Sequence, residues 1–439
     1  MKIEYIRCKF MKKFMKQLLL LALLTIPLEA FAVAQPLTVD RAVEKALEDN
    51  PSYAQIQFRY KALQDVPSQV GALPDPSIQL NAMNLPANDF DTTQEAMTQF
   101  QFGFSQAFPF PGKLSLKEKA AEYEAAAGLD NVHELRLRLK QQVTSSWWEL
   151  YYLEQSLDII DKNLNLLRQF VEIAETKYKV GDGLQQDVLL AQLELSKLLE
   201  QQIQVTSLHR NEVATLNTLM GEDANKALII ANSIDKTLPN IENADALFTE
   251  AKEKNPLFNR EENLIEAAKS RVELAEKEYY PDFKIGMAYG DRRGNNPAMA
   301  GGGKRDDVVS MMFNMSVPLY TVDKQDKGLS QRKNELSQRE YSLRDQHQAI
   351  LSRIVNLSSN YKRTTEQFKL FDTGIIPQAQ QTVDSMLAGY KVSEVDFLNL
   401  VRSQITLFNY QIRYWRALSQ AKQTLAKIEE ITVGENHYE

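Results

Sequence analysis

The stretch from Lys113 to Tyr178 contains no proline and a single glycine, and its apolar residues recur every three or four positions. The recurring positions are Leu150, Leu153, Leu157, Ile160, Leu164, Leu167, Val171, Ala174 and Tyr178. This heptad spacing is typical of helices that coil around partner helices. An unbroken helix of this length measures roughly 100 Å, much more than a globular core requires. The stretch therefore predicts either a coiled coil or the wall of an elongated assembly.

The long helix is expected to end at a tight turn and to be followed by a second helix. Gly181-Asp182-Gly183 breaks the helical pattern, and the pattern resumes from about Gln185 to Met220 before Gly221 ends it. Glycines at such positions commonly close one helix and allow the chain to reverse. The sequence therefore predicts a long antiparallel helical hairpin.

Four short segments alternate between apolar and polar residues: about 77–84, 98–108, 282–290 and 307–317. The second, for example, places Phe100, Phe102 and Phe104 on one face. Alternation of this kind over about 10 residues predicts strands with one apolar and one polar face. In a transmembrane barrel the apolar face meets lipid, whereas in a soluble sheet it packs on a core. The alternation is compatible with both.

The chain also repeats itself. Tyr178-Lys179-Val180 recurs as Tyr390-Lys391-Val392. Pro74-Asp75 recurs as Pro281-Asp282, and both of these pairs stand just before an alternating segment. Pro109 and Pro318 follow the second and fourth alternating segments. Such self-similarity over a large unit predicts two tandem copies of one plan: short helix, two strands, long helix, turn and returning helix.

The expected organisation is mainly α with a small β part, in two tandem structural repeats. Repeat 1 covers 35–221 and repeat 2 covers 246–432, with a linker at 222–245 and a C-terminal tail at 433–439. The long helix of repeat 2 contains Pro377. Since proline disrupts a helix interior, a kink or break is expected between Gly374 and Pro377.

Residues 1–34 have the order of a secretory signal peptide: basic residues, an apolar run from Leu18 to Ile26, and small residues near a cleavage site after Ala32 or Ala34. Either Met1 or Met11 is the start. The segment contains Cys8, the chain's only cysteine, so the mature chain is expected to have no disulfide or thiolate metal site. The formal net charge of −7 disfavours nucleic acid as a partner.

Three segments carry a resemblance to a known family. They are Tyr178-Lys-Val-Gly-Asp-Gly-Leu-Gln-Gln-Asp-Val-Leu-Leu-Ala-Gln192, Gly389-Tyr-Lys-Val-Ser-Glu-Val-Asp-Phe-Leu398 and Phe108-Pro-Phe-Pro-Gly-Lys-Leu114. The first two resemble the TolC-like outer-membrane efflux factors, and the third resembles the CusC-like and CzcC-like heavy-metal branch. The chain from about Leu37 to Ile431 is similar to this family.

The resemblance implies a homotrimer in the outer membrane of a Gram-negative bacterium. Each chain would give four strands to one transmembrane 12-stranded β-barrel, continued by a long periplasmic α-helical barrel. It also implies a periplasmic adaptor protein and an inner-membrane RND-type pump as partners, beside outer-membrane lipid. The strands themselves support an oligomer, because four strands cannot close a barrel and lipid tolerates no open sheet edge.

The resemblance further implies that the hairpin tips, 181–187 and 393–399, form the periplasmic gate and the adaptor contact. The candidate residues are Gly181, Asp182, Gly183, Asp187, Tyr390, Glu394, Asp396, Asn399 and Arg402. Threefold symmetry would turn each inward carboxylate into a ring that favours cations. Acidic residues at helix starts are also ordinary solvated caps, and both interpretations stay open. Asn399 and Arg402 stand where the family pattern has two acidic residues, so Arg402 is expected to pair with a neighbouring carboxylate.

Nothing in the sequence predicts catalysis, a cofactor or a resident metal. The four histidines are isolated, and no nucleophile, phosphate-loop or metalloprotease motif occurs. Met287, Met311, Met312 and Met315 are expected to be structural. The sequence therefore predicts a passive exit duct for small substrates, and the resemblance implies that these are heavy-metal cations. Multidrug efflux, type I protein secretion and a soluble periplasmic coiled-coil scaffold are the alternatives.

Overall fold

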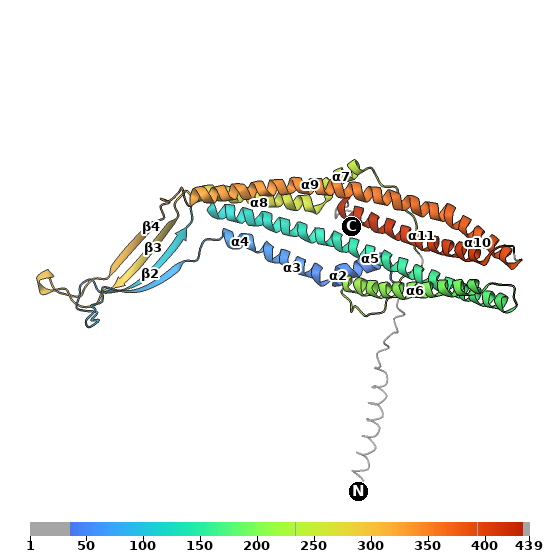
Figure 1. The fold of residues 1–439 in the computed structure, drawn as a ribbon. Helices are drawn as coiled ribbons and strands as arrows, with labels where there is room; N and C mark the ends of the chain where they lie inside the picture. Colours follow the sequence, from blue (N-terminus) through green and yellow to red (C-terminus); the bar gives the residue numbers. More distant parts are fainter. Residues whose placement is uncertain (1–35, 233, 393, 433–439) are drawn as a thin grey trace, which may run out of the picture. The chain divides into compact units, whose positions relative to one another are not determined.

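The computed structural model describes residues 36–232, 234–392 and 394–432 (Figure 1). The expected signal peptide 1–34, Ser393 of the second tip and the tail 433–439 therefore lie outside the described residues. The chain divides into two compact units. In the smaller, which includes Ala227–Asp235, Leu37 pairs with Ile230 in a parallel bridge. The larger unit contains all the helices and the sheet described below.

The larger unit follows the same order of elements twice. The first copy is α2 (Val39–Asp49), α3 (Pro51–Gln64), α4 (Val66–Gly71), β1 (Ser77–Met83), β2 (Gln99–Phe108), α5 (Lys113–Lys179) and α6 (Gln185–Leu219). The second is α7 (Ala244–Lys254), α8 (Pro256–Lys277), β3 (Phe283–Asp291), the short 3-10 helix η1 (Ala298–Ala300), β4 (Val308–Met315), α9 (Gln325–Leu370), the π-helix η2 (Phe371–Ile375), α10 (Ile376–Lys391) and α11 (Phe397–Thr432). The mainly helical fold in two tandem repeats is confirmed.

Two asparagines make the repeat visible in atomic detail. Asn50 caps α3 by accepting hydrogen bonds from the N–H groups of Ser52 and Tyr53, and its Nδ2 donates to the carbonyl of Leu219 at 2.8 Å. Asn255 caps α8 through the N–H of Leu257, and its Nδ2 donates to the carbonyl of Ile431, also at 2.8 Å. Each asparagine therefore ties the start of one helix to the end of the returning helix of its own repeat.

The four strands form one antiparallel sheet in the order β1-β2-β3-β4. Its register aligns Leu80 with Phe102, Phe102 with Tyr289, and Met287 with Met311. Because side chains alternate along a strand, all these apolar residues share one face. The face is exposed: Leu80 is 78% and Met311 79% accessible. On the opposite face, the central strands β2 and β3 carry the small residues Gly103, Ser105, Gly286, Ala288 and Gly290, which are buried between their neighbours, whereas the edge strands expose Asn81, Met312 and Asn314.

This exposure distinguishes the two interpretations of the alternating segments. A soluble sheet would bury its apolar face on a core, because exposing apolar area costs about 25 cal/mol per Å². Here the apolar face has no cover within the described residues, and its large side chains are exposed. The arrangement matches strands whose outer face meets lipid.

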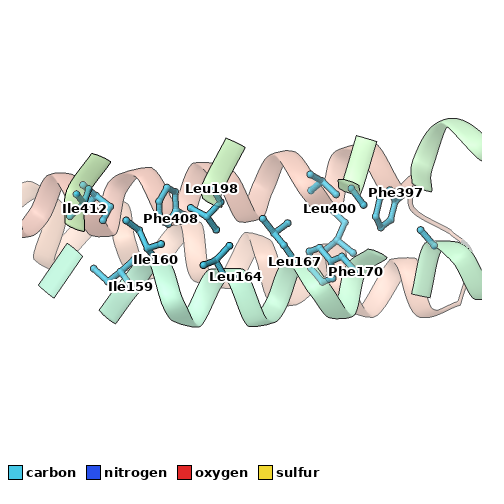
Figure 2. Close-up of a cluster of buried hydrophobic side chains, with 14 of the residues drawn as sticks. Ile159, Ile160, Leu164, Leu167, Phe170, Leu198, Phe397, Leu400, Phe408 and Ile412 are labelled. Carbon is cyan, nitrogen blue, oxygen red and sulfur yellow. The ribbon is translucent and has the colours of Figure 1, made fainter. Parts of the chain in front are cut away.

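The long helix α5 packs along α6 and α11, and its apolar seam forms the core between them (Figure 2). Leu153, Ile160, Leu164 and Leu167 are buried, as the heptad spacing predicts. They meet Leu198 of α6 and residues of α11 that include Leu400 and Phe408. The last seam position differs from the prediction: Tyr178 is 48% exposed, because α5 ends one residue later and the turn leads away.

The expected break in the second long helix is present. α9 ends at Leu370, a π-helix spans Phe371–Ile375, and α10 resumes with Pro377 in its first turn. Proline has no N–H, and its ring clashes with the carbonyl four residues earlier in a regular helix. The wider π-turn relieves that clash. Among the described residues, no helix has both the length and the apolar composition needed to cross a lipid bilayer.

Candidate gate at the hairpin tips

The first tip is closed by a hydrogen-bonded turn at the end of α5. The N–H of Asp182 donates to the carbonyl of Lys177 at 2.9 Å, and the N–H of Gly181 donates to that of Tyr178 at 3.1 Å. Gly181 adopts a positive φ of 82°, a conformation that favours glycine. These two bonds and this conformation are the Schellman arrangement that terminates helices. Gly183 is also constrained, since a Cβ there would lie 2.9 Å from the Cβ of Lys177.

The second tip uses the equivalent bond. The N–H of Glu394 donates to the carbonyl of Gly389 at 3.0 Å, at the position in α10 that matches Lys177 in α5. α11 then starts at Phe397, where the carbonyl of Asp396 accepts from the N–H of Asn399 at 3.1 Å. The two hairpins of the chain therefore end in matching turns.

Lys177 joins the two tips. Its Nζ lies 4.4 Å from the centre of the Tyr390 ring, and it donates to the Tyr390 carbonyl at 3.5 Å. The same nitrogen lies 4.0 Å from a carboxylate oxygen of Asp182. A cation over an aromatic face is stabilised by about 0.5–2 kcal/mol, depending on how far it is removed from water. One lysine of repeat 1 therefore contacts both its own tip and the tip of repeat 2.

Tyr390 belongs to a cluster of three aromatic rings next to the tips. Its ring centre is 5.4 Å from that of Phe397, which is 6.2 Å from that of Phe170 in a T-shaped arrangement. Tyr390 and Phe397 are both buried, and Figure 2 shows Phe170 and Phe397 at one end of the apolar core. The Lys177 ammonium therefore rests on a packed surface.

Three carboxylates surround this contact. Burial raises the pKa of Asp187, and the negative charge of Asp396 raises it further, while a hydrogen bond with the Leu184 backbone partly offsets the rise. Burial also raises the pKa of the Tyr390 hydroxyl, and the carboxylates of Asp187, Asp182 and Asp396 add to that effect. The tip is thus an acidic cluster that favours neutral or cationic neighbours.

Only some of the residues that the sequence predicts for the gate lie close together in the structure. Asp182, Asp187, Tyr390 and Asp396 lie close enough to influence one another electrostatically. Glu394, Asn399 and Arg402 are exposed outside this group. Arg402 forms no ion pair with any described residue of its own chain, so the pair expected for it is not made there; its carbonyl accepts a hydrogen bond from Thr406.

The family model described as outer membrane efflux protein matches residues 42–222 and 247–433. The chain belongs to this family. The two matched stretches lie on either side of the region between the repeats. The TolC-like resemblance of the sequence is therefore confirmed.

Individual relatives of this efflux protein are distant. The cobalt-zinc-cadmium resistance protein CzcC of Cupriavidus metallidurans is 19% identical over 412 residues, covering 92% of each chain. The channel CusC superposes with a TM-score of 0.75 at 14% identity, covering 90% of this chain and 92% of CusC. VceC of Vibrio cholerae superposes with a TM-score of 0.74 at 17% identity, covering 90% and 96%. These superpositions confirm the fold.

Lys177 is the tip residue of this efflux protein that the sequence did not reveal. A lysine in the last turn of a helix is common for the helix dipole alone, so its position gave no reason to single it out. Its equivalent in repeat 2 is Gly389, so the repeat gave no signal either.

No group of three or more His, Cys, Asp or Glu side chains in the described parts of the efflux protein is arranged to hold a metal ion. The methionines of the sheet are spread over both faces. Met287 and Met311 are paired on the exposed apolar face, and Met312 lies on the other face. Thioethers suit soft ions such as Cu(I), but methionines paired on an exposed apolar face occupy the position of ordinary apolar residues.

Proposed function

We propose that three copies of this chain form the outer-membrane exit duct of a tripartite efflux system. The observation that carries this proposal is the exposed apolar face of the sheet, on which Leu80, Phe102, Met287 and Met311 stand without cover. β1 and β4 each have a partner strand on one side only among the described residues. A four-stranded sheet in lipid needs partner chains at both edges, and a 12-stranded barrel supplies them.

The cargo we propose is heavy-metal cations. The relative CzcC is named for cobalt, zinc and cadmium resistance. The carboxylates of Asp182, Asp187 and Asp396 lie together at the tip, and threefold repetition would make a cation-favouring entrance of them. No tight metal site is needed, because passage through a duct requires weak binding.

The gate is proposed at the hairpin tips. Its residues are Gly181, Asp182, Gly183, Asp187, Tyr390, Glu394, Asp396, Asn399 and Arg402, to which Lys177 is added. In the closed state Lys177 holds the two tips of a subunit together. Opening separates them, and the substrate then moves down its gradient without consumption of energy by this protein.

The proposed partners are a periplasmic adaptor at the tips and an inner-membrane RND-type pump. Export to the outer membrane would use residues 1–34 as a cleaved signal peptide. The tip surface offers exposed apolar side chains for an adaptor, among them Val180, Leu184 and Val392.

The test is deletion of the gene and its replacement on a plasmid. Lost tolerance to cobalt, zinc or cadmium, restored by the plasmid, is the expected result. Drug tolerance and the amounts of secreted proteins are measured in the same strains. Unchanged metal tolerance together with lost drug tolerance or lost secretion would assign the duct to one of those other cargoes. A soluble periplasmic protein in fractionation would contradict the duct itself.

A further inference from the structure

We propose that Arg305 clamps the two loops at the far end of the sheet into one unit and so keeps them clear of the exit. Loop 1 (84–98) connects β1 to β2, and loop 2 (292–307) connects β3 to β4, both at the end of the sheet away from the helices (Figure 1). In the proposed duct this end faces the outside of the cell. The inference rests on that proposal and goes beyond it, since it assigns a role to a residue far from the gate.

Arg305 is a buried cation of loop 2 that binds the main chain of loop 1. Its side chain belongs to a residue only 6% exposed, and its Nη1 donates to the carbonyls of Thr93 and Glu95 of loop 1, each at 3.0 Å. A third bond, also 3.0 Å, goes to the carbonyl of Arg293 in its own loop. Arginine stays charged, and a buried charge is tolerated only where hydrogen bonds compensate it. Because the acceptors are backbone carbonyls, the guanidinium fixes the path of both main chains.

The Nε of Arg305 indicates that the arginine is not there for stability alone. This N–H is buried and has no hydrogen-bond partner in the described part of the chain. A buried donor without a partner is unfavourable, and an apolar side chain at this position would avoid that cost. The bonds from Nη1 to loop 1 are what an apolar side chain could not supply.

Gly294 of loop 2 is a second, separate sign of a built contact between the loops. Its φ is 93°, a conformation that favours glycine. A Cβ at this position would lie 2.9 Å from the carbonyl oxygen of Thr93 and 3.2 Å from Nη1 of Arg305. The backbone of loop 1 therefore approaches loop 2 as closely as a glycine allows.

Loop 1 contains backbone strain that needs outside support. Asn84 and Phe90 have positive φ values of 54° and 55°, and such a conformation is unfavourable for a bulky residue such as phenylalanine. Strained residues persist where the surrounding structure fixes them. The Oγ1 of Thr98 donates to the Asn84 carbonyl at 2.6 Å and so closes the base of the loop, but the Phe90 ring is 67% exposed and is held by little packing. The contacts from loop 2 supply the missing support.

Loop 2, in contrast, closes its own base. The N–H of Arg305 donates to the Gly294 carbonyl at 3.1 Å, and the N–H of Arg292 donates to the Asp307 carboxylate at 3.0 Å. Only its tip is open: the three glycines 301–303 have positive φ, and nothing lies within 4 Å of a Cβ built on any of them. Loop 2 is thus the support and loop 1 the supported element, so release of the clamp should free loop 1 in particular.

A freed loop 1 has a reason to move over the exit. Its Phe90 and Met97 are 67% and 61% exposed in the clamped position. Apolar side chains in water gain free energy by contact with other apolar surface. A released loop 1 can make such contacts across the mouth of the duct, whereas the clamped loop cannot.

Hydrogen exchange on the purified, full-length protein in detergent tests the clamp. Arg305→Met keeps much of the side-chain length and removes every donor. Amides of loop 1, including those of Phe90 and Thr98, donate hydrogen bonds to loop 1 carbonyls and are therefore protected in the clamped state. Their exchange should become at least tenfold faster in Arg305→Met. The matched control is Arg292→Met, since the Nε of Arg292 donates to the Asp306 carbonyl within loop 2, and it should leave loop 1 exchange unchanged. Unchanged exchange of loop 1 in Arg305→Met, or equal acceleration in both variants, would overturn the clamp.

Gly294→Ala tests the same clamp without removing a charge, because the added Cβ displaces the Thr93 carbonyl. It should also speed up loop 1 exchange, and it decides the matter if Arg305→Met does not assemble. Bilayer recording tests the role at the exit: Arg305→Met should show brief current blockades at least three times as often as Arg292→Met, and equal frequencies would overturn that role. If the unmodified chain forms no pore, the proposed duct fails, while the exchange result still decides whether Arg305 joins the loops.

Discussion

The ammonium group of Lys177, at the end of α5, lies 4.4 Å from the centre of the Tyr390 ring at the end of α10. These residues belong to different repeats, so the contact joins the tips of the two hairpins of one chain. The same ammonium also faces Asp182 at 4.0 Å. A gate that opens by separating its tips must break this contact first.

Replacing Lys177 by methionine keeps most of the side-chain volume and removes the charge. The loss should be about 1 kcal/mol of closed-state stability, which corresponds to about a fivefold rise in the open-to-closed ratio. Single-channel recording in planar bilayers measures it. The matched control is Lys179→Met, because Lys179 is exposed and its one ion pair among the described residues is with Glu175 of the same helix, at 3.7 Å. Equal effects of both variants would show that Lys177 has no special role.

The pH dependence of the gate follows from Asp187. Burial and the charge of Asp396 raise its pKa in the closed tip above the ordinary 3.8, so the protonated form is favoured there. If opening exposes Asp187, its pKa returns toward that value. The closed state is then most stable at low pH and loses this stabilisation as the pH rises through the raised pKa. Conductance should therefore fall on acidification, and Asp187→Asn should flatten the profile. A profile unchanged by Asp187→Asn contradicts the assignment.

Gly183→Ala tests the geometry of the first tip. The added Cβ would lie 2.9 Å from the Cβ of Lys177 and 3.1 Å from the N atom of Tyr178, so the turn must shift. A cost of about 1–3 kcal/mol is expected, with faster amide hydrogen exchange around 177–187. Gly328→Ala in α9 is the control: nothing lies within 4 Å of its Cβ, and alanine should stabilise the helix by about 0.5–1 kcal/mol. The same sign in both variants would argue against a constrained turn.

The tie between helix ends is tested at Asn255. Asn255→Ala removes the cap of α8 and also leaves the Ile431 carbonyl without its donor, which should cost about 2–3 kcal/mol of unfolding free energy. Asn243→Ala in α7 removes a cap alone, since Asn243 accepts from the N–H of Ala246, and should cost about 1 kcal/mol. Chemical denaturation compares the two. A smaller loss at Asn255 than at Asn243 would mean that the Ile431 bond contributes nothing.

The periodic parts of the fold could be predicted from the sequence because they depend on local rules. The seam from Leu150 to Ala174 follows the helical repeat, and the predicted strands differ from the observed ones by at most two residues at their ends. Pro377 predicted the break because its missing N–H acts in any surroundings. The prediction that Tyr178 is part of the buried seam was wrong. Its burial depends on where the helix ends and where the chain turns, and heptad spacing does not encode either.

The tip was predicted in position but not in detail. The glycines and the repeated Tyr-Lys-Val marked both turns, and Asp187, Tyr390 and Asp396 do lie together. Lys177 was missed because the residue that it contacts, Tyr390, is distant in the sequence. Arg402 was expected to pair with a carboxylate, but it lies one turn beyond Asn399, exposed on α11. Contacts between repeats are tertiary, so a single sequence carries little information on them.

Bilayer recording on the purified, detergent-solubilised protein tests most directly whether this chain forms a lipid-embedded duct. Stable pores of uniform conductance are expected at a protein mass of three chains, because the exposed apolar strands require lipid outside and neighbours at both edges. Protein that stays monomeric in solution without detergent and produces no conductance would contradict the account.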